Sequence, residues 1–474
     1  MAAVGAGVTA FQLSRPGMLF GITPDVSAWF GASIRLVHGA APYRDFFLSQ
    51  PPGFTLLATP FALLSDGIGT RNALAVMRLC TPMVAAANVL LIACVVGHRG
   101  RAAVVVAGAI VALAPAMLYA IQGPMLEPLL ALFCLLGIGR VFDGDVVAKP
   151  GRVALGGASL GFAVAIKLSA IVPALVLALL LTAVARRVLP RFVAGLAAGF
   201  GVPSLAFIAL APAAFARDVI GTQLNRVPSA ARLPAGPRLS DVTGTAWFGG
   251  GEVAAAAIFA VAAITVVLAF AAVRRPVAPL DWFAMAAAVA VLLAQLAPAV
   301  YYPHYAALTA PFIALILGLA AARLAPLHMG RAVAALGVVV CAALLALDAA
   351  SIRTASAPDY ATVVDSVIPA GGCTLSDAPS KLVTSDRFVS ARAGCTMVTD
   401  PNGAAVALIG DPTGAAMTWQ TAFQQSDYVV TDHPVNAWYI SATPSLLRYI
   451  AANFRIEWRG GLLFYMRSTV ASRM

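Results

Sequence analysis

The 474-residue chain has few charged residues for its length. Asp, Glu, Lys and Arg make up 11% of it, whereas a soluble domain is nearer a quarter charged. Hydrophobic residues make up 61%. These proportions exclude an ordinary soluble protein and predict one that crosses a membrane several times. There is also no internal repeat and no Gly-rich phosphate loop, so neither a two-fold transporter nor a nucleotide-dependent enzyme is indicated.

The apolar residues are gathered in segments suited to membrane helices. Helices of about 17–25 apolar residues cross a hydrocarbon core of about 30 Å. We predict spans near 70–96, 103–121, 125–141, 153–166, 168–185, 193–212, 253–272, 283–302, 305–322 and 332–350. Met1–Leu13 is apolar but too short, and we interpret it as the end of one more helix. The prediction is therefore about 10–11 transmembrane helices in an all-α domain over residues 1–352.

Basic residues orient these spans. Five links hold twelve of them: 98–101, 140–152, 186–191, 274–275 and 323–331. The positive-inside rule makes these links cytoplasmic. Because Arg152 and Arg186 are then on the same side, the segment between them must form a hairpin, turning near Lys167-Leu168-Ser169.

The remaining links are then external. They include loop 21–69, loop 213–252, the Tyr301–Tyr305 corner and the segment 353–474. The excess of positive charge, +11, is confined to the membrane part, because the segment after residue 352 has nine basic and nine acidic residues. We therefore predict a multi-pass plasma-membrane protein with the lipid bilayer, and no nucleic acid, as partner.

The C-terminal segment 353–474 is predicted to be a small extracytoplasmic α/β domain. Short β-prone runs at 373–375, 428–431 and 462–465 alternate with helix-like stretches such as 445–453. It has no metal-ligand cluster and no nucleophile–base signature. Cys373 and Cys395 lie here, where a disulfide can form, and we leave paired and free thiols as equal alternatives.

Cations on the external side are too numerous for the positive-inside rule. Ten of them lie there or within the membrane: Arg15, Arg35, Arg44, Arg71, Arg78, Lys167, Arg217, Arg226, Arg232 and Arg238. Such a set needs compensating anions, either lipid head groups or a bound phosphate. Lys167 is the strongest candidate for function, because an unpaired ammonium inside a membrane costs several kcal/mol.

Three carboxylates accompany these cations. Asp25 begins an amphipathic helix whose apolar face holds Val26, Trp29, Phe30, Ser33, Ile34 and Val37, so it is either an N-cap or a reactive group. Asp45 either pairs with Arg44 or has a role of its own. Glu127 suits the N-terminal end of a helix dipole. His304 is either an interfacial anchor or a phosphate ligand.

The order of motifs resembles the GT-C glycosyltransferases, in particular the protein O-mannosyltransferase and lipid A aminoarabinose transferase group. The matching stretches are Pro24-Asp25, His38-Gly39, Pro42-Tyr43-Arg44-Asp45-Phe46, Gln50-Pro51-Pro52-Gly53, Met125–Leu129, Ala165–Ser169 and Tyr302–Tyr305. The resemblance covers most of residues 15–350 and is loose after them. Many relatives have an Asp-Glu pair where this chain has Asp25-Val26.

The resemblance implies an inverting transferase that moves a sugar from a polyprenyl-phosphate donor on the outer face of the plasma membrane. Asp25 would be the general base, with Asp45 or Glu127 orienting it or the acceptor. Lys167, His304, Arg44 and Arg226 would hold the phosphate. Tyr43, Gln50 and Tyr302 would contact donor or acceptor.

The substrates remain open at this point. The donor is a substrate, so no cofactor is expected, and a divalent metal stays an alternative. The sugar is a hexose or pentose, such as mannose or arabinofuranose, and the acceptor a cell-envelope glycan, lipid or protein. A lipid or sugar transporter (a flippase) and a non-catalytic scaffold are the other classes.

Overall fold

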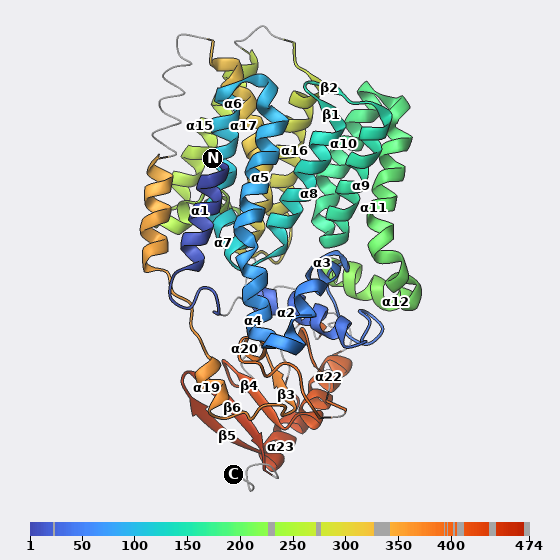
Figure 1. Cartoon of the computed structure of the whole chain (residues 1–474), viewed down its shortest axis with the longest axis vertical. Coiled ribbons are helices and arrows are strands. Elements are labelled where there is room, and N and C mark those ends of the chain that lie inside the picture. The colour runs from blue at the N-terminus through green and yellow to red at the C-terminus, as the bar shows by residue number, and fades with distance from the viewer. Residues whose placement is uncertain are drawn as a thin grey trace. The chain divides into compact units, whose positions relative to one another are not determined.

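The computed structural model of the chain (Figure 1) describes residues 1–21, 24–225, 233–271, 276–326, 342–392, 394–395, 397–401, 403–404, 412–435 and 442–468. Its contacts divide the chain into two compact units. The first comprises Met1–Arg15, Leu79–Pro203 and Ala231–Ala355, and the second Pro16–Arg78, Ser204–Ala230 and Ser356–Met474. The predicted boundary after residue 352 lies close to the last of these divisions. The second unit also takes in the predicted first external loop and part of the other.

The first unit consists almost entirely of helices that run side by side (Figure 1). They are α1 (Ala2–Leu13), α5 (Thr81–Val96), α6 (Arg101–Leu113), α7 (Pro115–Gln122), α8 (Leu126–Val141), α9 (Pro150–Ile166), α10 (Ile171–Val184), α11 (Leu189–Leu210), α14 (Ala235–Thr243), α15 (Glu252–Ala271), α16 (Pro279–Leu296), the 3-10 helix η6 (Pro303–Thr309) and α17 (Ala310–Leu324). Among the described residues, five helices are long and apolar enough to cross a membrane: Ser65–Arg99, Arg186–Leu210, Glu252–Ala271, Pro279–Leu296 and Pro303–Leu324. The pair α6–α7, bent by 51° where Pro115 follows α6, would be a sixth. The chain is a multi-pass membrane protein.

The predicted helical hairpin is confirmed. Helix α9 ends at Ile166, Lys167 is extended, and a 3-10 turn at Leu168–Ala170 leads into α10. The predicted span 332–350 lies mostly outside the described residues.

Helices α9 and α11 approach each other closely through small residues. Gly157 and Gly161 of α9 face the carbonyls of Phe192 and Leu196, while Gly195 and Gly199 of α11 face α9 in return. A Cβ built on any of the four would lie about 2 Å from a backbone oxygen of the other helix. Only glycine therefore fits at these positions.

A polar network joins three of the predicted cytoplasmic links, 98–101, 140–152 and 323–331. Asp281 is fully buried and accepts hydrogen bonds from Arg323 at 2.7 Å and from Arg99 at 3.0 Å. Arg99 also donates to Asp145, which contacts His98 Nε2 at 2.7 Å. These three links, which share the predicted side of the membrane, are thus connected through Asp281 and Asp145.

The second unit combines short helices with one sheet. Its elements are α2 (Pro24–Val37), α3 (Gly53–Ala62), α4 (Ser65–Leu79), α12 (Pro212–Phe215), the π-helix η4 (Ala216–Gly221), α13 (Thr222–Asn225), α19 (Ala361–Asp365), β3 (Thr374–Ser376), α20 (Ser380–Val383), α22 (Pro412–Gln425), β4 (Tyr428–Thr431), α23 (Pro444–Asn453), β5 (Phe454–Arg459) and β6 (Leu462–Arg467). The strand order is β3-β4-β6-β5, with β3–β4 parallel and the other pairs antiparallel.

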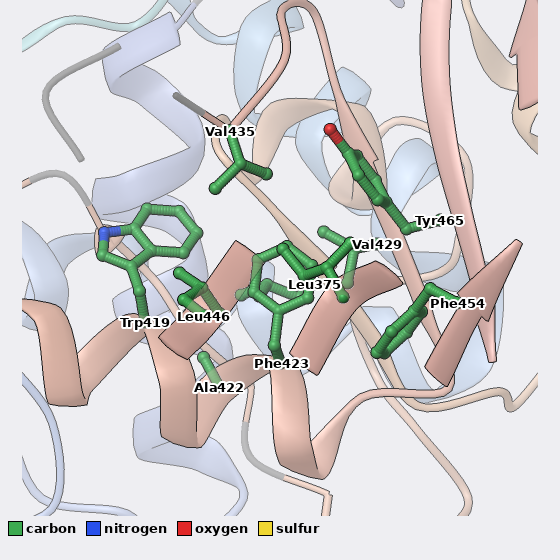
Figure 2. Packing of buried hydrophobic residues seen from close by; sticks show 10 residues of the cluster. Leu375, Trp419, Ala422, Phe423, Val429, Val435, Leu446, Phe454 and Tyr465 are labelled. Carbon is green, nitrogen blue, oxygen red and sulfur yellow. The ribbon is translucent and has the colours of Figure 1, made fainter. Parts of the chain in front are cut away.

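The sheet packs against α22 and α23 around aromatic side chains (Figure 2). Phe423 of α22 lies edge-on to Phe454 and Tyr465 of the sheet, with ring centroids 5.7 and 5.8 Å apart. The predicted α/β tail is confirmed, and its three expected strands correspond to β3, β4 and β6. Strand β5 was not predicted, because most of its side chains are exposed or half-exposed and it lacks a buried alternating face. Cys373 and Cys395 form a disulfide, which decides between the two alternatives.

One contact within the second unit joins the C-terminal segment to α4. Helical geometry breaks at Gly69 (φ 83°) and resumes at Thr70. The Asp386 carboxylate accepts from the Arg71 N–H at 2.8 Å and from Thr70 Oγ1 at 3.1 Å, and so caps the new helical start from the far end of the sequence. Glycine is favoured at position 69 because its positive φ would strain a residue with a side chain, and a Cβ would also lie 2.6 Å from that carboxylate. Arg71 also pairs with Asp359 at 2.6 Å.

Candidate functional site

A buried acid–base cluster in the first unit brings together residues predicted from distant motifs. Glu127, at the start of α8, is 2% exposed, and its Oε1 accepts a 2.6 Å hydrogen bond from Lys167 Nζ. His304 of η6 places Nε2 3.9 Å from the same oxygen. The Oε2 atom of Glu127 is buried and has no hydrogen-bond partner among the described residues.

Local structure explains why these groups meet. The α9–α10 turn interrupts the helix at Lys167, so its side chain projects from a break, and Pro303 starts η6 so that His304 follows directly. Glu127 occupies the first turn of α8, where the helix dipole favours a carboxylate. Each charged group therefore lies at the end of a helix or beside a break in one.

Tyrosines surround the cluster. Lys167 Nζ lies 3.8 Å from the centroid of the Tyr305 ring, a cation–π contact. The Tyr302 ring stacks on His304 at 5.8 Å, and Tyr305 packs edge-on to His304 at 4.7 Å. The predicted contact residue Tyr302 thus belongs to this cluster. Tyr305 was not predicted as a site residue, although it ends the motif that contains His304.

Asp25 lies in the second unit and is half-buried. The predicted apolar face of α2 is confirmed at Val26, Phe30, Ser33 and Ile34, which are fully buried. The predicted N-cap position is wrong, because α2 begins at Pro24 and Asp25 is its second residue. A carboxylate in the first turn still interacts favourably with the helix dipole.

The loop that follows α2 is braced by its own polar residues. Arg44 donates to Asp45 at 2.8 and 3.0 Å, and the Ala41 N–H donates to the same carboxylate at 2.7 Å. These bonds from Arg44 and Ala41 lower the pKa of Asp45 to about 2. So acidic a carboxylate is a weak base, and the geometry suits a loop brace better than a proton acceptor.

Tyr43 adopts a left-handed backbone (φ 67°), and its hydroxyl donates to the Gln50 carbonyl at 2.7 Å. Its ring packs edge-on to Phe215 at 5.0 Å. Burial raises the pKa of Tyr43, and the nearby Asp218 carboxylate raises it further. Asp218 is fully buried beside Arg217 and was not predicted as part of the site, because a lone acid next to an arginine looks like a surface pair.

Most of the external cations bind groups of the chain itself, and three of them show the range of these partners. Arg238 donates to the carbonyls of Leu233, Gln295, Leu296 and Pro298, and Arg78 donates to those of Leu19 and Gly21. Arg71 pairs with a carboxylate of the C-terminal segment. A carboxylate of the chain therefore neutralises Arg71, and backbone carbonyls accept hydrogen bonds from Arg78 and Arg238.

Two predictions about the site stay predictions: the role of Arg226 and the shared cavity of Asp25 and the cluster. Arg226 lies outside the described residues. Asp25 and the Glu127–Lys167–His304 cluster belong to different units, and their sharing of one cavity stays a prediction. Among the described residues, no group of three or more His, Cys, Asp or Glu side chains is placed to hold a metal ion.

The fold is that of known membrane glycosyltransferases. The ArnT structure from Cupriavidus metallidurans bound to undecaprenyl phosphate superposes with a TM-score of 0.60 at 15% identity, over 98% of this chain and 96% of ArnT. Its apo form superposes equally well at 14% identity. The apo oligosaccharyltransferase of Archaeoglobus fulgidus gives a TM-score of 0.56 at 12% identity, over 90% of this chain and 69% of that one.

The chain therefore has the GT-C fold, as its motifs implied. No protein-family model matches the sequence. A comparison with curated proteins finds no match either.

Proposed function

We propose that this protein is a membrane glycosyltransferase that takes a sugar from a polyprenyl-phosphate donor on the outer face of the plasma membrane. The buried Glu127–Lys167–His304 cluster carries the proposal. Its setting supports it, because a solved structure of the same fold holds undecaprenyl phosphate. An acid, an ammonium and an imidazole clustered at helix ends in a membrane protein mark a functional site by default.

The cluster suits a phosphate leaving group. When the glycosidic bond to phosphate breaks, negative charge develops on the lipid phosphate and needs fixed cations nearby. Lys167 carries three N–H donors, so it can contact Glu127 and a phosphate oxygen together. Glu127 would fix the direction of the ammonium, and His304 would add a second donor. Tyr302 would hold the imidazole ring by stacking.

Asp25 is the proposed general base. Its carboxylate would take the proton of the acceptor hydroxyl as the hydroxyl oxygen attacks the anomeric carbon. The new glycosidic bond forms on the face opposite the departing phosphate, so the configuration inverts. Asp45 and Arg44 would hold the shape of the loop after α2, and Tyr43 would anchor that loop through Gln50.

Replacement of Asp25 tests the reaction. With purified full-length protein and polyprenyl-phosphate donors carrying mannose, arabinose, galactose or an amino sugar, D25N should lower transfer by roughly 10²–10⁴-fold. D66N is the matched control, because Asp66 is an exposed acid that lies, like Asp25, in the segment 21–69 predicted to be external. Wild-type transfer by D25N would rule out Asp25 as the base.

The transporter alternative has its own outcome. If the native protein transfers none of these sugars but moves a labelled polyprenyl-phosphate sugar across a vesicle membrane, the chain is a flippase. Mass analysis of envelope glycans from a deletion strain would then identify the sugar and the acceptor, which we propose to be a cell-envelope glycan.

A further inference from the structure

A groove in the first unit lies at the end of α8 opposite Glu127. It has a volume of about 320 Å³ and is lined by Leu91, Cys94, Val95, Leu135, Leu136, Gly139, Arg140, Phe142, Asp143, Gly144 and Arg152. Arg140 lies thirteen positions after Glu127 on α8, which is about 20 Å along the helix axis. The groove is therefore remote from the proposed transferase site, and the inference does not depend on that function.

The walls of the groove are apolar along the helices and polar at one end. Leu91 and Val95 of α5 line the groove together with Leu135 and Leu136 of α8, and Gly139 contributes no side chain to it. A Cβ at Gly139 would touch only Val95, at 3.4 Å. The apolar side of the groove suits a hydrocarbon chain.

The polar end carries two arginines with different tasks. Arg152 is held by the chain itself: it donates to the carbonyls of Gly139 and Phe142 and pairs with Asp143 at 3.0 Å. Arg140 is exposed and, within the described residues, makes no ion pair. The adjoining 98–101 link belongs to the predicted cytoplasmic side, where anionic lipid is enriched.

We propose that this groove binds an anionic phospholipid, with an acyl chain between α5 and α8 and the phosphate at Arg140. An apolar slot ending in an uncompensated guanidinium matches a lipid that combines an acyl chain with a phosphodiester anion. A zwitterionic lipid would supply the chain but bring a second cation toward Arg152 and Arg140. The site therefore prefers an anionic head group.

Cys94 offers a direct readout, since it is an exposed free thiol lining the groove. Full-length protein in detergent micelles is treated with N-ethylmaleimide, and modification of each cysteine is followed by peptide mass analysis. Dioctanoyl phosphatidylglycerol should slow the modification of Cys94 several-fold. It should leave Cys80, a partly exposed free thiol outside the groove, unchanged.

Two variants separate charge from shape. R140Q should raise the phosphatidylglycerol concentration needed for half protection roughly fivefold, whereas R187Q, an exposed arginine away from the groove, should not. G139L should fill the groove and abolish the protection of Cys94 by phosphatidylglycerol without changing the charge of the protein. If R140Q does not fold, added salt must weaken protection of the native protein instead.

Three results would overturn the proposal. Phosphatidylcholine protecting Cys94 at the same concentration would mean an unselective lipid surface. Inorganic phosphate giving the same protection would mean a simple anion site. Equal half-protection for R140Q and the native protein would remove Arg140 from the site.

Discussion

Replacement of Lys167 by methionine is expected to destabilise the protein, because the buried Glu127 carboxylate loses its partner. The apolar side chain keeps much of the length of lysine but removes the 2.6 Å donor from Glu127 Oε1. Glu127 is 2% exposed, so water cannot replace that donor easily. At 2.6 Å and an effective dielectric constant of about 20, the lost attraction is about 6 kcal/mol.

The net loss of stability in K167M should be smaller than this lost attraction. Glu127 can take up a proton, and His304 Nε2, 3.9 Å away, is a second partner. Loss of one member of a buried pair costs about 3–5 kcal/mol in other proteins, and we expect K167M to fall in this range. E127Q should cost less, because Lys167 is more exposed than Glu127 and keeps its contact with Tyr305.

A double-mutant cycle measures this directly. Equilibrium unfolding in detergent micelles is compared for the native protein, K167M, E127Q and K167M/E127Q. The double variant should be more stable than K167M by about 2 kcal/mol or more, because the buried charge has gone with its partner. A cost below about 1 kcal/mol for K167M, or a double variant no more stable than K167M, would refute the buried-pair reasoning.

Three further predictions concern the second unit. D386A should lower stability by about 1–2 kcal/mol through loss of the cap at Thr70 and Arg71, with D386N less affected; equal unfolding midpoints for D386A and the native protein would contradict the cap. Reducing the Cys373–Cys395 disulfide, whose cysteines are 22 positions apart, should lower the free energy of unfolding by about 3 kcal/mol. The unfolding midpoint of the native protein should therefore fall when reductant is added, whereas that of C373S/C395S should not change. The low pKa of Asp45 means that its carboxylate stabilises the fold above about pH 4, and that this contribution is lost as pH falls toward 2. D45N should therefore flatten the acid limb of the stability curve, and an unchanged limb would assign the acid sensitivity to other groups.

The predictions for the Glu127–Lys167–His304 cluster and for Asp45 depend on different physical causes. Glu127, Lys167 and His304 were each suspect for a local reason, a charge placed at the end of an apolar segment. Their convergence depends on three helix ends meeting, which the structure shows for residues 40 and 177 positions away from Glu127. The Arg44–Asp45 pair was one of the two predicted alternatives, and the structure confirms it. The low pKa of Asp45 also depends on the Ala41 N–H, which only the shape of the loop brings to the carboxylate.

Local chemistry was sufficient for the membrane class, the hairpin turn at Lys167 and three strands of the tail. Hydropathy, loop charge and β-branched runs are properties of neighbouring residues, so they can be read along the chain. Tertiary structure alone decided that carbonyls at the end of α16 accept hydrogen bonds from Arg238 and that Asp386 caps a helix more than 300 positions earlier. It also decided that the two cysteines pair. These pairings depend on how each helix is rotated and on which distant segments come into contact. The residue pattern of a single segment determines neither of these.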